Sequence, residues 1–176
     1  MEMATRGRCY EHRWFALFAQ SRVVNRTISI VDLHAIRGKE IGLSRWFNID
    51  QERINLFAEA TEDQQFIHVD SKRAKDTSFG GTIAHGFLSL SMLSAMAEDA
   101  VPIVENLVHS INYGFNRIRF LTPVSVGSRI HGRFNLLAVS EGEGHVTLTY
   151  NVTVEIEGVD KPALVAEWIT RHYFSQ

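Results

Sequence analysis

Residues 84–100, AHGFLSLSMLSAMAEDA, decide the expected fold because they form a helix with almost no polar face. Apolar side chains fill the stretch between Phe87 and Met96, where the only polar interruptions are three serines, Ser89, Ser91 and Ser94. A helix that is apolar nearly all round is expected to be buried. We therefore predict a buried helix over about residues 84–98, and Pro102 lies just beyond its end.

Four segments with strand character follow this helix. Apolar residues alternate strictly with polar ones between Val146 and Ile156, which is typical of an antiparallel strand with one buried face. Turn residues separate the segments, including Gly127 after Pro123 and Gly158. One buried helix and a run of antiparallel strands predict an α+β fold in which a curved antiparallel sheet wraps around the helix. The segments are VHSINYGFNRIRFL, SRIHGRFNLLAVSE, GHVTLTYNVTVEIEG and PALVAEWITRHYF.

The part of the chain before the buried helix is more irregular. Asp50 is expected to cap a short amphipathic helix in QERINLFAEAT. The preceding segment LSRWFNI has strand character, and DLHAIRGKEIG predicts a helical turn closed by Gly38 and Gly42. Apolar residues between positions 61 and 82 follow neither the helical nor the strand period, so we predict a long ordered loop there. Loops of this length in compact domains are usually either functional or disordered.

Residues 1–31 differ in charge from the rest of the chain. They hold five Arg and two Glu, so their net charge is +3, whereas the whole chain carries −2. We interpret them as an N-terminal extension that is disordered or reflects a misassigned start, with organellar targeting as the alternative. Residues 32–176 are then expected to form a single domain.

The composition excludes several classes of protein. Hydrophobic residues make up 45% and charged residues 22%, as in soluble globular proteins. No apolar run approaches the ~18–20 residues of a membrane span, and the overall charge gives no case for nucleic-acid binding. The single cysteine, Cys9, excludes an intrachain disulfide and is compatible with the reducing cytoplasm, where we expect the protein.

Two motifs, DQQFIHVD at residues 63–70 and GGTIAHGF at residues 80–87, hold the residues that can carry chemistry. Asp63 and His68 can converge on one water molecule and act in general acid–base catalysis. Gly86 begins the buried helix, where free backbone N–H groups can bind a developing oxyanion. Hydration of a thioester-activated double bond needs these parts.

Together the motifs resemble the MaoC-like dehydratases, a hot-dog family that includes R-specific enoyl-CoA hydratases. EDQQFIHVD…FGGTIAHGFLSLS is especially similar to the nodulation-protein-N-like branch, and NYGFNRIRFLTPVSVGSRI is similar to the strand and turn that follow the helix in the family. The resemblance covers about residues 32–174. It implies a hot-dog fold and an (R)-specific enoyl-CoA hydratase, or 3-hydroxyacyl-thioester dehydratase.

The resemblance also implies roles for individual residues. Asp63 and His68 would form the catalytic pair that activates water, and the backbone N–H of Gly86 would be the oxyanion-hole donor. Ser94 falls where some family members place a hydroxyl near that pair, which makes it a weaker supporting candidate. Gln65 replaces the family's commoner asparagine, and its amide can make the same hydrogen bonds as an orienting residue.

The expected partners follow from the same resemblance. The substrate would be an acyl-CoA or acyl-carrier-protein thioester, with coenzyme A present only as part of the substrate. No metal is expected, since the spacing of His68, Asp70 and His85 matches no common zinc motif. A homodimer joined at the sheet edges would cover the exposed edge strand. A hot-dog acyl-CoA thioesterase and a non-catalytic acyl-thioester binding module are the alternatives.

Overall fold

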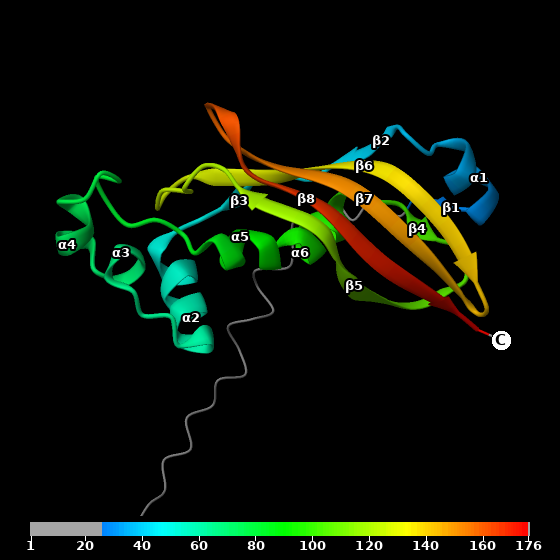
Figure 1. The fold of residues 1–176 in the computed structure, drawn as a ribbon, viewed down its shortest axis with the longest axis horizontal. Helices are drawn as coiled ribbons and strands as arrows, with labels where there is room; N and C mark the ends of the chain where they lie inside the picture. Colours follow the sequence, from blue (N-terminus) through cyan, green and yellow to red (C-terminus); the bar gives the residue numbers. More distant parts are fainter. Residues whose placement is uncertain (1–25, 176) are drawn as a thin grey trace, which may run out of the picture.

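A computed structural model describes residues 26–175 and contains one long helical segment packed under a curved sheet (Figure 1). The helical segment consists of α5 (Gly86–Ser91) and α6 (Leu93–Ala100), which meet at Met92. This is the predicted hot-dog architecture. The sheet consists of β2 (Glu40–Leu43), β3 (Phe47–Asn48), β5 (Leu107–Phe120), β6 (Arg129–Gly142), β7 (His145–Ile156) and β8 (Val159–Phe174).

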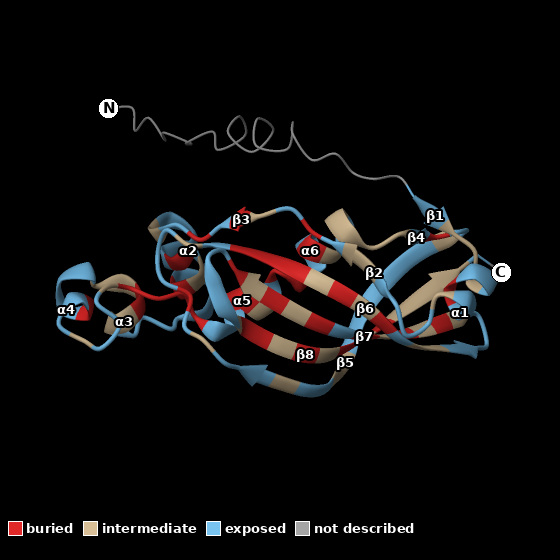
Figure 2. Ribbon diagram, turned by 90° about the horizontal axis from the view of Figure 1, so that it is seen from above, coloured by how far each residue is buried: buried red, intermediate tan, exposed pale blue. Residues whose placement is uncertain are grey.

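The strands pair in the order β2-β6-β7-β8-β5, with β3 also pairing with β6, and every pairing in this sheet is antiparallel. The alternation predicted for β7 is confirmed, because every second residue from Val146 to Ile156 is buried. Figure 2 shows the same banding along β6 and β8. The buried bands face α5 and α6, and the core that they form includes Phe134, Leu148 and Met96.

The helix is less completely buried than its composition predicts. Phe87 is 66% exposed, and Ser91 and Ser94 also lie on an exposed side, because the sheet covers only one face of the helix. Among residues 26–175, no helix is long and apolar enough to cross a membrane.

The interpretation of Gly42 as the end of a helical turn is wrong. The helix there, α1 (Ile30–Ala35), ends before Gly38, whose φ is +83°, and Gly42 lies within β2. A Cβ on Gly42 would lie 1.9 Å from the carbonyl oxygen of Ala100. Glycine is needed there because the sheet edge approaches the backbone at the end of α6.

The long loop predicted for residues 61–82 is in part helical. The expected helix α2 (Gln51–Thr61) is confirmed, with the Asp50 carboxylate accepting from the backbone N–H of Arg53. Two short helices then follow, α3 (Phe66–Val69) and α4 (Ser71–Lys75). They are too short to produce a periodic pattern, and α4 depends on an Asp70 side-chain cap. All three helices lie beyond one end of the sheet (Figure 1).

The opposite end of the molecule carries a small parallel pair of strands, β1 (Thr27–Ile28) and β4 (Ile103–Val104). This pair brings residues before position 32 into the fold, a few residues earlier than the predicted boundary. The expectations for residues 1–25 lie outside the described residues.

Candidate active site

His68 is held on α3 so that one ring nitrogen remains free. The side chain is 6% exposed, and Nδ1 lies 2.7 Å from the backbone carbonyl oxygen of Ile83. A carbonyl only accepts hydrogen bonds, so Nδ1 carries the proton in the neutral ring and Nε2 keeps its lone pair. Nε2 has no hydrogen-bond partner among the described residues. The tautomer therefore suits a general base.

The backbone of His68 is fixed by neighbouring segments. Its N–H donates to the carbonyl of Gln65 at 2.9 Å, and its carbonyl accepts from the Gln51 side-chain amide at 2.8 Å. The oxygen of that amide accepts from the Thr82 hydroxyl at 2.5 Å. Helix α2 and the segment before α5 thus hold the imidazole from two sides.

Burial lowers the pKa of His68 below its ordinary value of 6.5, and the adjacent His85 acts in the same direction. The hydrogen bond to the Ile83 carbonyl and the charge of Asp63 raise the pKa and oppose this effect. Because the lowering is larger, the ring is neutral at physiological pH and available to accept a proton.

His85 packs directly on His68. The two rings stack with centroids 3.7 Å apart, and His85 is 3% exposed. Its Nε2 lies 3.0 Å from the backbone carbonyl oxygen of Asp63, so the Nε2–H donates to that carbonyl. Nδ1 of His85 is buried and has no partner among the described residues. His85 therefore connects the imidazole of His68 to the segment that carries Asp63.

The carboxylate of Asp63 lies beside these rings. One carboxylate oxygen is 4.0 Å from His85 Nε2, and the side chain is 52% exposed. A carboxylate oxygen of Asp63 and one ring nitrogen each of His68 and His85 all lie within 4.8 Å of one another. A single water molecule, about 2.8 Å from each partner, can bridge such a separation. The structure thus brings the predicted carboxylate and imidazole together.

Gly86 and His68 line one cavity of about 370 Å³, which we call the His68 cavity. Phe120 and Pro123 also line it. Gly86 is the first residue of α5, where backbone N–H groups have no partner within the helix. A Cβ at this position would lie 3.0 Å from the Phe120 ring. The missing side chain lets the Phe120 ring pack against the backbone at the start of α5.

The other two predicted residues occupy different places. Gln65 is exposed, and its described contacts are made by the backbone: the carbonyl accepts from His68, and the N–H lies 3.4 Å from Asp63 Oδ1. The structure does not bring Ser94 to Asp63 and His68. Its hydroxyl accepts from the Asn112 amide at 3.4 Å and lines a second cavity of about 410 Å³, which we call the His172 cavity.

Sequence reasoning missed His85 and Gln51. His85 was assigned no role beyond its position before Gly86, and Gln51 belonged only to a helical pattern. Their partners are backbone carbonyls and a distant threonine, which leave no spacing pattern in the sequence. The sequence does offer one signal for His85, because this histidine immediately precedes the glycine that begins the buried helix.

The trio of Asp63, His68 and His85 also has the donor types of a small metal site. His68 Nε2 and His85 Nδ1 both keep lone pairs in the tautomers described above. The expectation that the protein uses no metal stays a prediction, and chelation tests it.

A hot-dog fold that holds a neutral imidazole and a helix N-terminus at one cavity, with a carboxylate close to the imidazole, has the features of acyl-thioester hydratases and dehydratases. Comparison with known families gives the same class, because residues 32–156 match the MaoC like domain. The chain belongs to the MaoC-like dehydratase family.

Curated relatives extend this finding. The chain is 51% identical over 150 residues to nodulation protein N of Rhizobium meliloti, covering 84% of this chain and 93% of the relative. It is 47% identical over 145 residues to 3-hydroxyacyl-thioester dehydratase Z of Mycobacterium tuberculosis, covering 82% and 95%. The solved (R)-hydratase of A. caviae superposes with a TM-score of 0.61 at 25% identity, covering 76% of this chain and 94% of that one.

Proposed function

We propose that the protein is a hydro-lyase that reversibly adds water across the 2,3 double bond of an enoyl thioester, with (R) stereochemistry. The observation that carries the proposal is the free Nε2 of a buried, neutral His68 in the same cavity as Gly86, with the Asp63 carboxylate one water molecule away. The relative named as a 3-hydroxyacyl-thioester dehydratase supports the reaction class.

In the hydration direction, the thioester carbonyl accepts a hydrogen bond from the Gly86 N–H. Asp63 and His68 hold one water molecule between them and take one of its protons as its oxygen bonds to the β-carbon. The electron pair of the double bond moves toward the thioester, where the Gly86 amide stabilises the negative charge on the carbonyl oxygen. The α-carbon then takes a proton from the catalytic pair on the same face, and dehydration is the reverse path.

Two substitutions test the catalytic pair. Asp63→Asn and His68→Ala should each lower crotonyl-CoA hydration about 100-fold or more, since each removes a general acid–base group. Loss of the enoyl absorbance measures the reaction, and circular dichroism checks the fold. Near-normal turnover in either variant would remove that residue from the mechanism. Release of free CoA without loss of the enoyl group would indicate a thioesterase, and binding without turnover a non-catalytic module.

We also propose that the protein is a homodimer joined at β5. This strand lies at the edge of the sheet, is 14 residues long and exposes four large apolar side chains, those of Val108, Ile111, Tyr113 and Phe120. An exposed edge with apolar side chains is a template for strand pairing. Sedimentation at micromolar concentration should give twice the chain mass, and a monomer would contradict the proposal.

A further inference from the structure

Ser89 lines the His68 cavity, but the mechanism described above gives it no part. It lies on α5 one helical turn after Gly86, and residues three positions apart face the same side of a helix. The residue is 3% exposed. Ser89 therefore shares one cavity with the two groups that the proposed reaction uses, His68 and Gly86.

The hydroxyl of Ser89 has no hydrogen-bond partner among the described residues. Ser91 on the same helix donates its hydroxyl to the carbonyl of Phe87 at 2.7 Å, a common arrangement for a helical serine. Ser89 makes no such bond, and its hydroxyl is not one of the fully buried side-chain atoms that lack a partner. The oxygen therefore keeps accessible surface, and a molecule in the cavity can reach it.

Two side-chain hydroxyls line the described part of this cavity, those of Ser89 and Thr122. The hydroxyl of Thr122 donates to the carbonyl of Lys161 at 3.3 Å, so its proton is already used. The Nδ1–H of His68 is likewise donated to the carbonyl of Ile83. Among the side chains described in this lining, Ser89 therefore has the free donor.

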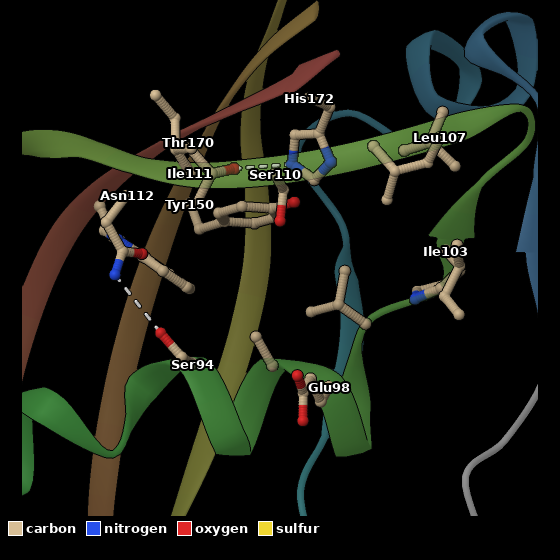
Figure 3. Close-up of a pocket in the computed structure, with 15 residues that line it drawn as sticks. Ser94, Glu98, Ile103, Leu107, Ser110, Ile111, Asn112, Tyr150, Thr170 and His172 are labelled. Carbon is tan, nitrogen blue, oxygen red and sulfur yellow. Dashed lines mark hydrogen bonds between the residues drawn. The ribbon is translucent and has the colours of Figure 1, made fainter. Parts of the chain in front are cut away.

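Ser94, which sequence reasoning favoured as the supporting hydroxyl, does not lie in this cavity. Figure 3 shows its hydroxyl directed toward the side-chain amide of Asn112 on β5, 3.4 Å away. Ser94 lines the His172 cavity, and Ser89 lines the His68 cavity. The hydroxyl in the cavity of the proposed reaction thus comes from a serine five residues earlier on the helical segment.

The water molecule of the proposed reaction needs a donor that neither Asp63 nor His68 supplies. An ionised carboxylate and the unprotonated nitrogen of a neutral imidazole only accept hydrogen bonds. A water molecule between them directs both protons to these acceptors and keeps its two lone pairs for other partners. One lone pair bonds to the β-carbon, so a donor on the other lone pair fixes the orientation of the water.

The spacing on the helix matches the spacing of the two oxygens in a 3-hydroxyacyl thioester. Three positions separate Gly86 from Ser89, which is a rise of roughly 4.5 Å at 1.5 Å per residue. The thioester carbonyl and the 3-hydroxyl sit on carbons two bonds apart, so with bonds of about 1.5 Å their oxygens lie roughly 3–5 Å from each other. With the carbonyl oxygen at the Gly86 N–H, the second oxygen lies within reach of Ser89.

We propose that the Ser89 hydroxyl donates a hydrogen bond to the oxygen that is added to, or removed from, the β-carbon. The inference rests on the proposed function, because it requires water addition in the His68 cavity. Ser89 transfers no proton, and its O–H bond stays intact throughout. Asp63 and His68 take one proton of the water, the other proton stays on the new 3-hydroxyl group, and Ser89 holds the oxygen in place.

Ser89→Ala removes the hydroxyl, and its effect should differ between the two directions of the reaction. Crotonyl-CoA has no oxygen on its β-carbon, so in hydration KM should stay unchanged and kcat should fall about fivefold, the effect of one hydrogen bond. (R)-3-Hydroxybutyryl-CoA carries that oxygen, so in dehydration KM should rise about fivefold at nearly constant kcat. The fixed equilibrium constant requires the same loss of kcat/KM in both directions.

Two controls accompany this variant. Butyryl-CoA has the thioester without a β-oxygen, so it should inhibit Ser89→Ala and the unsubstituted protein with the same inhibition constant. Ser91→Ala is the matched substitution, since Ser91 is exposed and lies outside the lining of the His68 cavity, and all its constants should stay unchanged. Alanine forms helices better than serine, so circular dichroism should show an intact fold in both variants.

Unchanged constants in Ser89→Ala would overturn the inference and leave the proposed function intact. An equal weakening of butyryl-CoA and of 3-hydroxybutyryl-CoA would also overturn it, because the hydroxyl would then contact the thioester. The same losses in Ser91→Ala would show a general effect on the helix and would count against the inference as well. If the unsubstituted protein does not interconvert crotonyl-CoA and 3-hydroxybutyryl-CoA, the proposed function fails and the inference fails with it.

Discussion

The His85→Phe variant tests whether His85 positions Asp63, because it should lower activity without lowering the stability of the fold. The substitution keeps a flat ring that can stack on His68, and it removes the Nε2–H that donates to the Asp63 carbonyl. That hydrogen bond contributes about 1 kcal/mol, which corresponds to roughly a fivefold change in the population of the correctly placed Asp63. We therefore expect kcat to fall about fivefold with KM nearly unchanged.

The same variant should be at least as stable as the unsubstituted protein. It eliminates Nδ1, which is buried and without a partner among the described residues, and an unpaired buried group costs about 1–3 kcal/mol. The lost hydrogen bond offsets about 1 kcal/mol of this gain, so the free energy of unfolding should rise by about 0–2 kcal/mol. For a chain of this length, Tm would increase by at most about 8 °C.

Crotonyl-CoA hydration and thermal unfolding measured on the same preparations decide the outcome. His85→Ala is the companion variant, because it also removes the ring stack, which contributes about 0.5–1.5 kcal/mol. Its kcat should fall roughly 10–70-fold. If His85→Phe retains full kcat, the imidazole N–H does not position Asp63. If Tm and kcat fall together, loss of stability explains the effect and the positioning argument is wrong.

Three further outcomes are expected. Because burial keeps the pKa of His68 below 6.5, the acid limb of kcat/KM should have its midpoint below pH 6.5, and a midpoint above that value contradicts a neutral His68 base. Gly86→Ala places a Cβ 3.0 Å from the Phe120 ring. The backbone at Gly86 should then shift by a few tenths of an ångström, and kcat should fall about tenfold. Gly81→Ala is the control because a Cβ there meets open space, and equal effects of the two variants would show that the Phe120 contact is irrelevant. Dialysis against a chelator should leave turnover unchanged, and a loss restored by one divalent cation would assign a metal to Asp63, His68 and His85.

The sequence predicted the elements that depend on local chemistry. Asp50 caps α2 through its own side chain, and the alternation in β7 follows from one buried face. Gly127 and Gly158 lie in turns with positive φ, as the turn residues indicated. The proximity of Asp63 to His68 was predictable because both residues belong to one short motif, and the structure brings them within reach of one water molecule. Their catalytic role stays a prediction.

Features that depend on tertiary contacts were not predictable from one sequence. Helix α3 is a single turn. It is tied to the segment before α5 by a hydrogen bond from the N–H of Ile83 to the carbonyl of Ile67. Strand β1 pairs with β4 across 76 positions of the chain, from Thr27 to Ile103. Ser94 was placed by analogy along the helix, whereas its actual neighbour, Asn112, comes from β5.

The fold leaves a few buried side-chain nitrogens without a hydrogen-bond partner. Among the described residues, the buried side-chain atoms without a partner are His85 Nδ1, Trp168 Nε1, Arg171 Nε and His172 Nδ1. Arg171 packs over the Tyr113 ring, His85 stacks on His68, and Trp168 and His172 line the His172 cavity. Each destabilises the free protein by about 1–3 kcal/mol. Replacing such a nitrogen by carbon removes this cost, which is why His85→Phe is expected to keep or raise the stability of the fold while it lowers turnover.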